Sequence, residues 1–76
     1  KLTFRDQHRL DSLPGEIDQL ESEIARLEAL LSDPDLYTKD PDTFTKATGA
    51  LSARQARLSS AEEECLSLDE KQERLG

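Results

Sequence analysis

The chain has 76 residues and a net charge of −7, and 36% of its residues are charged while 34% are hydrophobic. A chain of this length buries only about 60% of its unfolded surface, which excludes a deep catalytic pocket, and its acidity excludes broad attraction to nucleic acid or anionic lipid. No apolar run approaches the roughly 18 residues of a membrane span, so we expect no membrane contact. The short, polar composition favours a soluble helical protein that is not an enzyme.

Residues 1–12 are predicted to form a short first helix or linker. Thr3 followed by Asp6 resembles the capping box that begins a helix. Pro14 has no amide N–H and disfavours helical conformation at the residue before it. We therefore expect a break near Pro14, between this segment and the next.

The first long arm is predicted over residues 13–32. Apolar residues between positions 10 and 31 recur at alternating spacings of three and four, which is the a/d pattern of a coiled coil. The residues of this apolar seam are Leu10, Leu13, Ile17, Leu20, Ile24, Leu27 and Leu31.

A Pro-containing tip loop is predicted over residues 33–41, because its prolines stand among turn-forming and capping residues. Residues 33–40 are the non-helical connection, and residue 41 is also the first residue of the second arm. Asp40 is expected to cap the second arm, predicted over residues 41–75, with Pro41 in its first position. Half of the d-type positions of this arm are Ala or polar, so its seam is weaker. Its seam residues are Phe44, Leu51, Leu58, Cys65 and Leu68.

The two arms are predicted to form an all-α, antiparallel two-helix coiled-coil hairpin that is monomeric. The register that buries the seam makes the numbers of facing residues add up to about 75. Ile24 then meets Leu51, and Ile17 meets Leu58. Leu20 faces polar residues and is the one poor layer of this register.

Four segments carry a family resemblance: Lys1–Pro14 (KLTFRDQHRLDSLP), Ile17-x-x-Leu20-Glu21, Leu31–Tyr37 (LSDPDLY) and Ala61–Leu68 (AEEECLSL). They resemble the C-terminal domain of Uup-type ABC-F ATPases. The resemblance implies a coiled-coil arm over residues 1–76 that follows two ATP-binding cassettes, so that ATP and Mg²⁺ are bound upstream and no cofactor is bound here. It also implies a cytoplasmic protein that acts on ribosomes, with DNA binding by this domain in the Uup branch.

The sequence departs from that family pattern at two places. Glu64-Cys65 stands where relatives tend to carry Arg-Trp, and Gly49 interrupts the second arm. The chain begins at Lys1 without a methionine, so we expect it to be a fragment of a larger protein. Its single cysteine excludes an internal disulfide and fits a reducing compartment.

Two groups of basic residues are candidate phosphate contacts. The predicted register places the groups far apart, and no aromatic residue is interleaved with either for base stacking. The alternative is that these side chains are solvated and partly paired with the many acidic residues. The candidates are Lys1, Arg5 and Arg9 in the first group and Lys46, Arg54 and Arg57 in the second.

No catalytic, cofactor or metal site is predicted within the chain. Four aspartates near the tip lack the glycine and closing glutamate of a calcium loop, and turn and cap chemistry explains them. One cysteine and one histidine are too few for a zinc site, so Cys65 is read as a small seam residue and His8 as a solvated one.

Two hypotheses follow. The leading one is a non-catalytic arm of an ABC-F ATPase that helps to recognise or position DNA or the ribosome, or that contacts the parent's ATPase domains in cis. The second is a purely structural coiled-coil interaction module without nucleic-acid contact.

Overall fold

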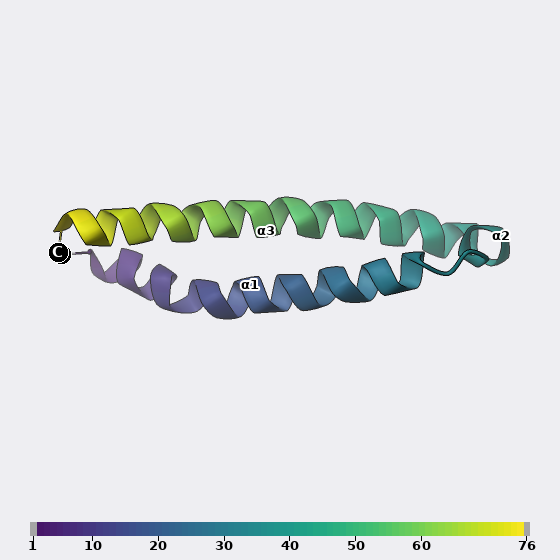
Figure 1. The fold of residues 1–76 in the computed structure, drawn as a ribbon, viewed down its shortest axis with the longest axis horizontal. Helices are drawn as coiled ribbons and strands as arrows, with labels where there is room; N and C mark the ends of the chain where they lie inside the picture. The colour runs from purple at the N-terminus through teal and green to yellow at the C-terminus, as the bar shows by residue number, and fades with distance from the viewer. Residues whose placement is uncertain (1, 76) are drawn as a thin grey trace.

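The computed structural model describes residues 2–75, which form two long antiparallel helices joined at one end by a short one (Figure 1). α1 spans Phe4–Leu31, α2 spans Leu36–Lys39 and α3 spans Pro41–Leu75. The molecule measures 55 × 16 × 15 Å, with α2 at the end opposite both chain termini. The predicted helical hairpin is confirmed. None of the helices in the described residues is long and apolar enough to cross a membrane.

Side-chain caps define where the two long helices begin. The Thr3 hydroxyl accepts a hydrogen bond from the amide of Asp6 at 3.1 Å. The Asp40 carboxylate accepts one from the amide of Thr43 at 3.1 Å and one from the Thr43 hydroxyl at 2.6 Å. These bonds hold the pKa of Asp40 below its usual value and satisfy an amide that has no partner within the helix. α3 therefore begins at Pro41, as predicted.

α1 passes through Pro14 without a break, so the predicted break is wrong and residues 4–12 belong to the same helix as the first arm. Pro14 is exposed, and its ring removes one backbone hydrogen bond on the solvent side of a helix that is bowed in Figure 1. Leu13 is buried and Leu10 and Ile17 pack beside it. Because one fully buried Leu contributes about 1.5–3 kcal/mol, packing on both sides of Pro14 outweighs its cost of about 3 kcal/mol.

The predicted tip loop contains a helical turn, α2, which packs against α3. Leu36 is buried there, and the Asp33 carboxylate accepts a hydrogen bond from the amide of Asp35 at 2.9 Å. The ring of Tyr37 meets that of Phe44 edge to face, with 5.2 Å between centroids. The tip is therefore held by local contacts at both of its ends.

The core is a narrow seam in which leucine and isoleucine side chains of α1 pack against both alanine and leucine side chains of α3. Leu20 is only 4% exposed, so the layer that was expected to fit poorly is well buried. Leu27, Leu31, Phe44 and Leu51 are half-buried. The buried side chains are Leu13, Leu20, Ile24, Leu36, Ala47, Ala61 and Leu68, and Leu10, Ile17, Leu58 and Cys65 pack against the central cluster.

Replacing Leu13 by alanine is expected to destabilise the hairpin by about 2–5 kcal/mol, because this side chain is 0% exposed and its removal leaves a cavity. Urea or thermal unfolding followed by circular dichroism measures the change. Leu66→Ala is the matched control, since Leu66 is 61% exposed and its loss should cost less than about 0.5 kcal/mol. Equal effects of the two substitutions would contradict this core.

Replacing Pro14 by alanine is expected to stabilise the hairpin, by up to about 3 kcal/mol, because an amide donor is restored inside a continuous helix. The same unfolding experiment measures the gain. A Pro14→Ala variant with unchanged or reduced stability would indicate that the helix does not run through this position.

Candidate nucleic-acid interface

The two long helices present two different edges, which follow from the heptad positions. In α1, Leu10 and Ile17 stand at a and Leu13 at d; in α3, Cys65 stands at a and Leu68 at d. In an antiparallel pair the g positions of both helices line one edge of the seam and the e positions line the other. Position c flanks the g edge, and position b flanks the e edge.

Four ion pairs join α1 to α3, and all of them involve a g position. Their residue numbers add up to 73 or 77, on either side of the predicted 75, so the pairs agree with the predicted register. The pairs are Asp6–Lys71 at 2.6 Å, Arg9–Glu64 at 2.6 Å, Glu16–Arg57 at 3.8 Å and Glu23–Arg54 at 2.5 Å.

Arg9 is the most strongly bound of the candidate bases. Its Nε and Nη2 donate to the two carboxylate oxygens of Glu64 at 2.6 and 2.8 Å, and its Nη1 donates to Glu16 at 2.6 Å. The two carboxylates raise the pKa of Arg9, Glu64 more than Glu16, and Arg9 lowers the pKa of each carboxyl in return. A phosphate that binds Arg9 therefore has to compete with two carboxylates.

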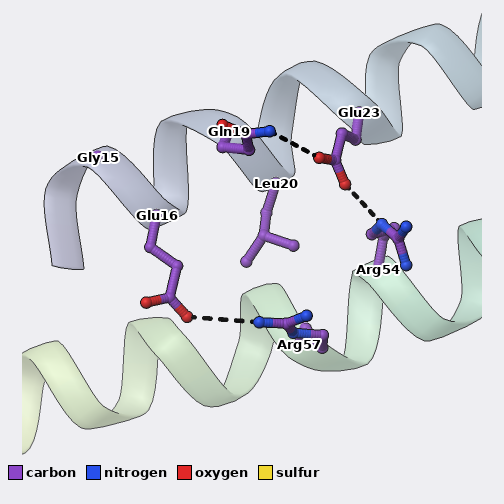
Figure 2. A pocket seen from close by; sticks show the side chains of 7 residues that line it. All are labelled: Gly15, Glu16, Gln19, Leu20, Glu23, Arg54 and Arg57. Atoms are coloured by element: carbon purple, nitrogen blue, oxygen red, sulfur yellow. Dashed lines mark hydrogen bonds and ion pairs between the residues drawn. The ribbon is translucent and has the colours of Figure 1, made fainter. Parts of the chain in front are cut away.

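Glu16 connects the two groups of basic residues that were predicted to lie far apart, so that prediction is wrong. Its carboxylate contacts Arg9 of α1 at 2.6 Å and Arg57 of α3 at 3.8 Å. Figure 2 shows Glu16 and Arg57 reaching toward each other across the seam. Arg57 keeps 64% of its side chain exposed, which makes it the more available of the two arginines.

Arg54 occupies a d position, in line with buried Ala47 and Ala61, yet it reaches the same edge. Its Nε donates to Glu23 at 2.5 Å while Glu23 also accepts from the side-chain amide of Gln19 at 3.0 Å (Figure 2). Gln19 first, and then Arg54, lower the pKa of Glu23. The g position of α3 that faces Glu23 is Ala50, which carries no charge. The guanidinium of Arg54, which comes from the seam, therefore pairs with Glu23 instead.

A continuous shallow groove follows this edge. Four depressions lie along it, and each shares two lining residues with the next. Its α1 side runs from residue 5 to residue 26, about 30 Å at 1.5 Å per residue. We name this groove the arginine edge, after the arginines that line it: Arg5, Arg9, Arg26, Arg54 and Arg57.

The opposite side of the hairpin is acidic. Among the described residues of α1 and α3, the e and b positions hold no lysine or arginine, whereas all the basic residues of these helices stand at c, d or g. We name this side the acidic edge. Its charged residues are Asp11, Asp18, Glu21, Glu28, Glu62, Asp69 and Glu73.

The other candidates are placed as follows. Arg5 and Lys46 are exposed, and no ion pair is found for either within residues 2–75. Lys1 lies outside the described residues. Arg26, which lines the groove, was not among the predicted contacts. The sequence signal that could have identified this edge is the heptad position of each charged residue, since all the basic residues of α1 and α3 stand at c, d or g.

The remaining reactive groups do not form a second site. Across the described part of the chain, no three His, Cys, Asp or Glu side chains gather into a set that could hold a metal ion. The Cys65 thiol is half-buried and lies 3.9 Å from a carboxylate oxygen of Asp69. His8 stacks on Phe4, with 6.4 Å between ring centroids.

Comparison with known proteins gives one family. The family model described as the ABC transporter C-terminal domain matches residues 1–70. Neither the curated proteins nor the solved structures contain a match to the chain.

Replacing Arg9 by glutamine is expected to raise the carboxyl pKa values of Glu16 and Glu64 toward their ordinary value, because the hydrogen bonds that lower them are lost. A lowered folded-state pKa stabilises the fold fully above the ordinary carboxyl range, and that stabilisation disappears as pH falls through the lowered values. Acid should therefore weaken Arg9→Gln less than the parent chain.

Carboxyl ¹³C NMR titration and unfolding at several pH values measure both effects. Arg26→Gln is the control, because Arg26 lies on the same edge and no ion pair is found for it in the described chain. If Arg26→Gln shifted the two glutamates as much as Arg9→Gln, the cause would be the general field of the edge rather than these contacts.

Proposed function

Because the chain belongs to the ABC transporter C-terminal domain family, and so forms the non-catalytic C-terminal part of an ABC protein, we propose that it is a nucleic-acid-contacting arm. The parent would be an ABC-F ATPase of the Uup type, as the resemblance of its opening segment and tip suggests. ATP and Mg²⁺ would be bound by cassettes ahead of residue 1, in the cytoplasm. The arm itself would act as a monomeric hairpin.

The observation that carries the proposal is the alignment of five arginines along one groove about 30 Å long. Nucleic-acid backbones present regularly spaced phosphates, and arginine binds phosphate oxygens through its fork of N–H donors. Four carboxylates line the same groove, and heptad spacing adds Lys46, Lys71 and Arg74 to the basic side. This edge is therefore net positive although the whole chain is net negative.

The ligand that fits is a duplex backbone of DNA or ribosomal RNA, bound without base contacts. The groove-lining residues include no Phe, Tyr or Trp ring on which a base could stack, and the imidazole of His8 lies only at one end of the groove. Because phosphates replace Glu16 and Glu64 on Arg9, each contact is an exchange of one anion for another. We expect micromolar or weaker affinity at physiological salt, as is usual for non-specific binding at about 10⁻⁴–10⁻⁶ M.

The second candidate function is a purely structural coiled coil. The geometry at Arg9 favours it, since this guanidinium already has two carboxylate partners and needs no further ligand to be satisfied. In that case the arginines serve only to hold the two helices in register.

A matched pair of variants separates the two functions. Glu16→Gln and Glu21→Gln remove the same charge, but Glu16 lines the arginine edge and Glu21 lies on the acidic edge. We expect Glu16→Gln to strengthen binding to duplex DNA or RNA several-fold, because Arg57 is released and Arg9 keeps only Glu64 as a carboxylate partner. Glu21→Gln should change binding little. Fluorescence anisotropy over a range of salt concentrations measures this.

The salt dependence gives a second readout. Arg57→Gln should lower the slope of log affinity against log salt by about 0.9 on DNA, which corresponds to one phosphate contact. Equal effects of Glu16→Gln and Glu21→Gln would mean that only overall charge matters. Binding by none of the forms at low salt would favour the structural module.

A further inference from the structure

The arginine edge changes character toward the tip of the hairpin. The g positions nearer the chain termini hold the charged side chains that form the ion pairs between α1 and α3. The three g positions nearest the tip carry no charge: Leu30, Thr43 and Ala50. Leu30 is 41% exposed, so this stretch of the edge presents apolar surface to solvent.

A depression of about 230 Å³ opens on this stretch, and its lining residues are Glu23, Arg26, Leu27, Ala50 and Arg54. Leu30 lies next to it, because residues three and four apart are neighbours on a helix surface and Leu30 follows Leu27 by three and Arg26 by four. We name Leu27, Leu30 and Ala50 the tip-side patch. The volume is below the roughly 300–1,000 Å³ of sites for drug-sized ligands, so the depression suits a side chain of a partner rather than a small molecule.

Basic side chains flank the tip-side patch on both helices. On α1, Arg26 is exposed, and no ion pair is found for it in the described chain. On α3, Lys46 and Arg54 stand one turn on either side of the patch alanine. The carboxylate of Glu23 already accepts from Arg54 at 2.5 Å, and Asp40, which feels the charge of Lys46, caps α3. Three bases against two engaged carboxylates leave the rim of the patch positive.

We propose that the tip-side patch docks an acidic amphipathic helix of a partner protein. Apolar side chains of such a helix, spaced three and four residues apart, lie on Leu27, Leu30 and Ala50, as in helix-in-groove recognition. Its flanking glutamates or aspartates face the bases of α1 on one side and those of α3 on the other. The docked segment is thus a third helix laid along the edge between the two arms.

A phosphate backbone fits this patch less well than an acidic helix does. Leu30 and Ala50 offer no side-chain donor to a phosphate, whereas an amphipathic helix buries its own apolar side chains on them. An acidic helix therefore uses both the apolar floor and the positive rim. The inference goes beyond nucleic-acid binding and does not depend on it, although both ligands use Arg26 and Arg54.

The test titrates the full-length protein that carries this chain into a fluorescein-labelled peptide of about 15 residues and follows anisotropy. The peptide has leucines in an i, i+3, i+4, i+7 stripe and glutamates elsewhere. The control peptide has the same composition and charge, with its leucines placed so that no stripe forms. We expect the striped peptide to bind at least about five-fold more tightly, because only this peptide sets its leucines together on the patch.

Variants of the protein locate the site. Leu30→Ser should remove most of the preference for the striped peptide, and helix content measured by circular dichroism should stay unchanged because Leu30 is partly exposed. Leu66→Ser is the matched control, since Leu66 is 61% exposed at a b position and its loss should leave the preference intact. Arg26→Gln should weaken both peptides alike, because it removes charge from the rim and leaves the apolar floor in place.

Equal binding of the two peptides, or equal effects of Leu30→Ser and Leu66→Ser, overturns the proposal. So does a loss of duplex DNA binding in Leu30→Ser as large as its loss of peptide binding, because the patch is then part of the nucleic-acid surface. Self-association seen by sedimentation and abolished by Leu30→Ser also overturns it, because a second copy is then the occupant. Failure of the proposed function is recognised separately, by the comparison of Glu16→Gln with Glu21→Gln on duplexes.

Discussion

The packing of Leu13 and Leu20 against Ala61 and Leu68 sets the register on which every other feature of the hairpin depends. Once two helices pack at these positions, the residues that face each other along the rest of the pair are fixed, because a heptad spans two turns in both helices. Sliding α3 by one heptad in one direction would set Arg9 opposite Arg57. Sliding it the other way would set Arg9 opposite Lys71 and Glu16 opposite Glu64. The individual surface ion pairs are worth only about 0–1 kcal/mol each, but both slipped registers bring like charges together.

The same register sorts the charges of the molecule onto two sides. The basic residues of α1 and α3 fall at c, d and g positions, and seven acidic residues fall at b and e positions. The net charge of −7 is therefore an average over two unlike surfaces. At physiological ionic strength the Debye length is about 8 Å, half the short dimension of 16 Å, so a ligand on one side is largely screened from the other. Local charge, rather than the total, governs what each side binds.

Much of the hairpin could be predicted from the sequence, because its strongest signals are local. The seam from Leu10 to Leu31 and the cap at Asp40 depend on spacing and on the chemistry of single residues, and the start of α3 was predicted correctly. The break at Pro14 was wrong because a local preference is overridden by the packing of Leu13 on α3, which only the folded chain possesses.

The candidate interface was harder to predict, since its members are far apart in the sequence. Arg9 and Glu64 are separated by 55 positions, and Arg54 reaches the edge from a seam position by extending its side chain. The register deduced from the apolar residues already predicts that the g positions of the two helices face each other. It does not predict the side-chain conformation by which Glu16 contacts both Arg9 and Arg57, and these two contacts join the two basic groups along one groove.

The width of the hairpin limits how it can meet a double helix. Its two short dimensions, 16 and 15 Å, exceed the width of about 12 Å of the major groove of B-DNA. Unlike a single recognition helix, the paired helices cannot enter the groove and read base edges. They can only lie across or along the sugar–phosphate ridges, where the information available is the spacing of phosphates, the curvature of the duplex and the ease of bending it. A preference of this arm among nucleic acids would then be a preference for bent, branched or A-form geometry rather than for a sequence.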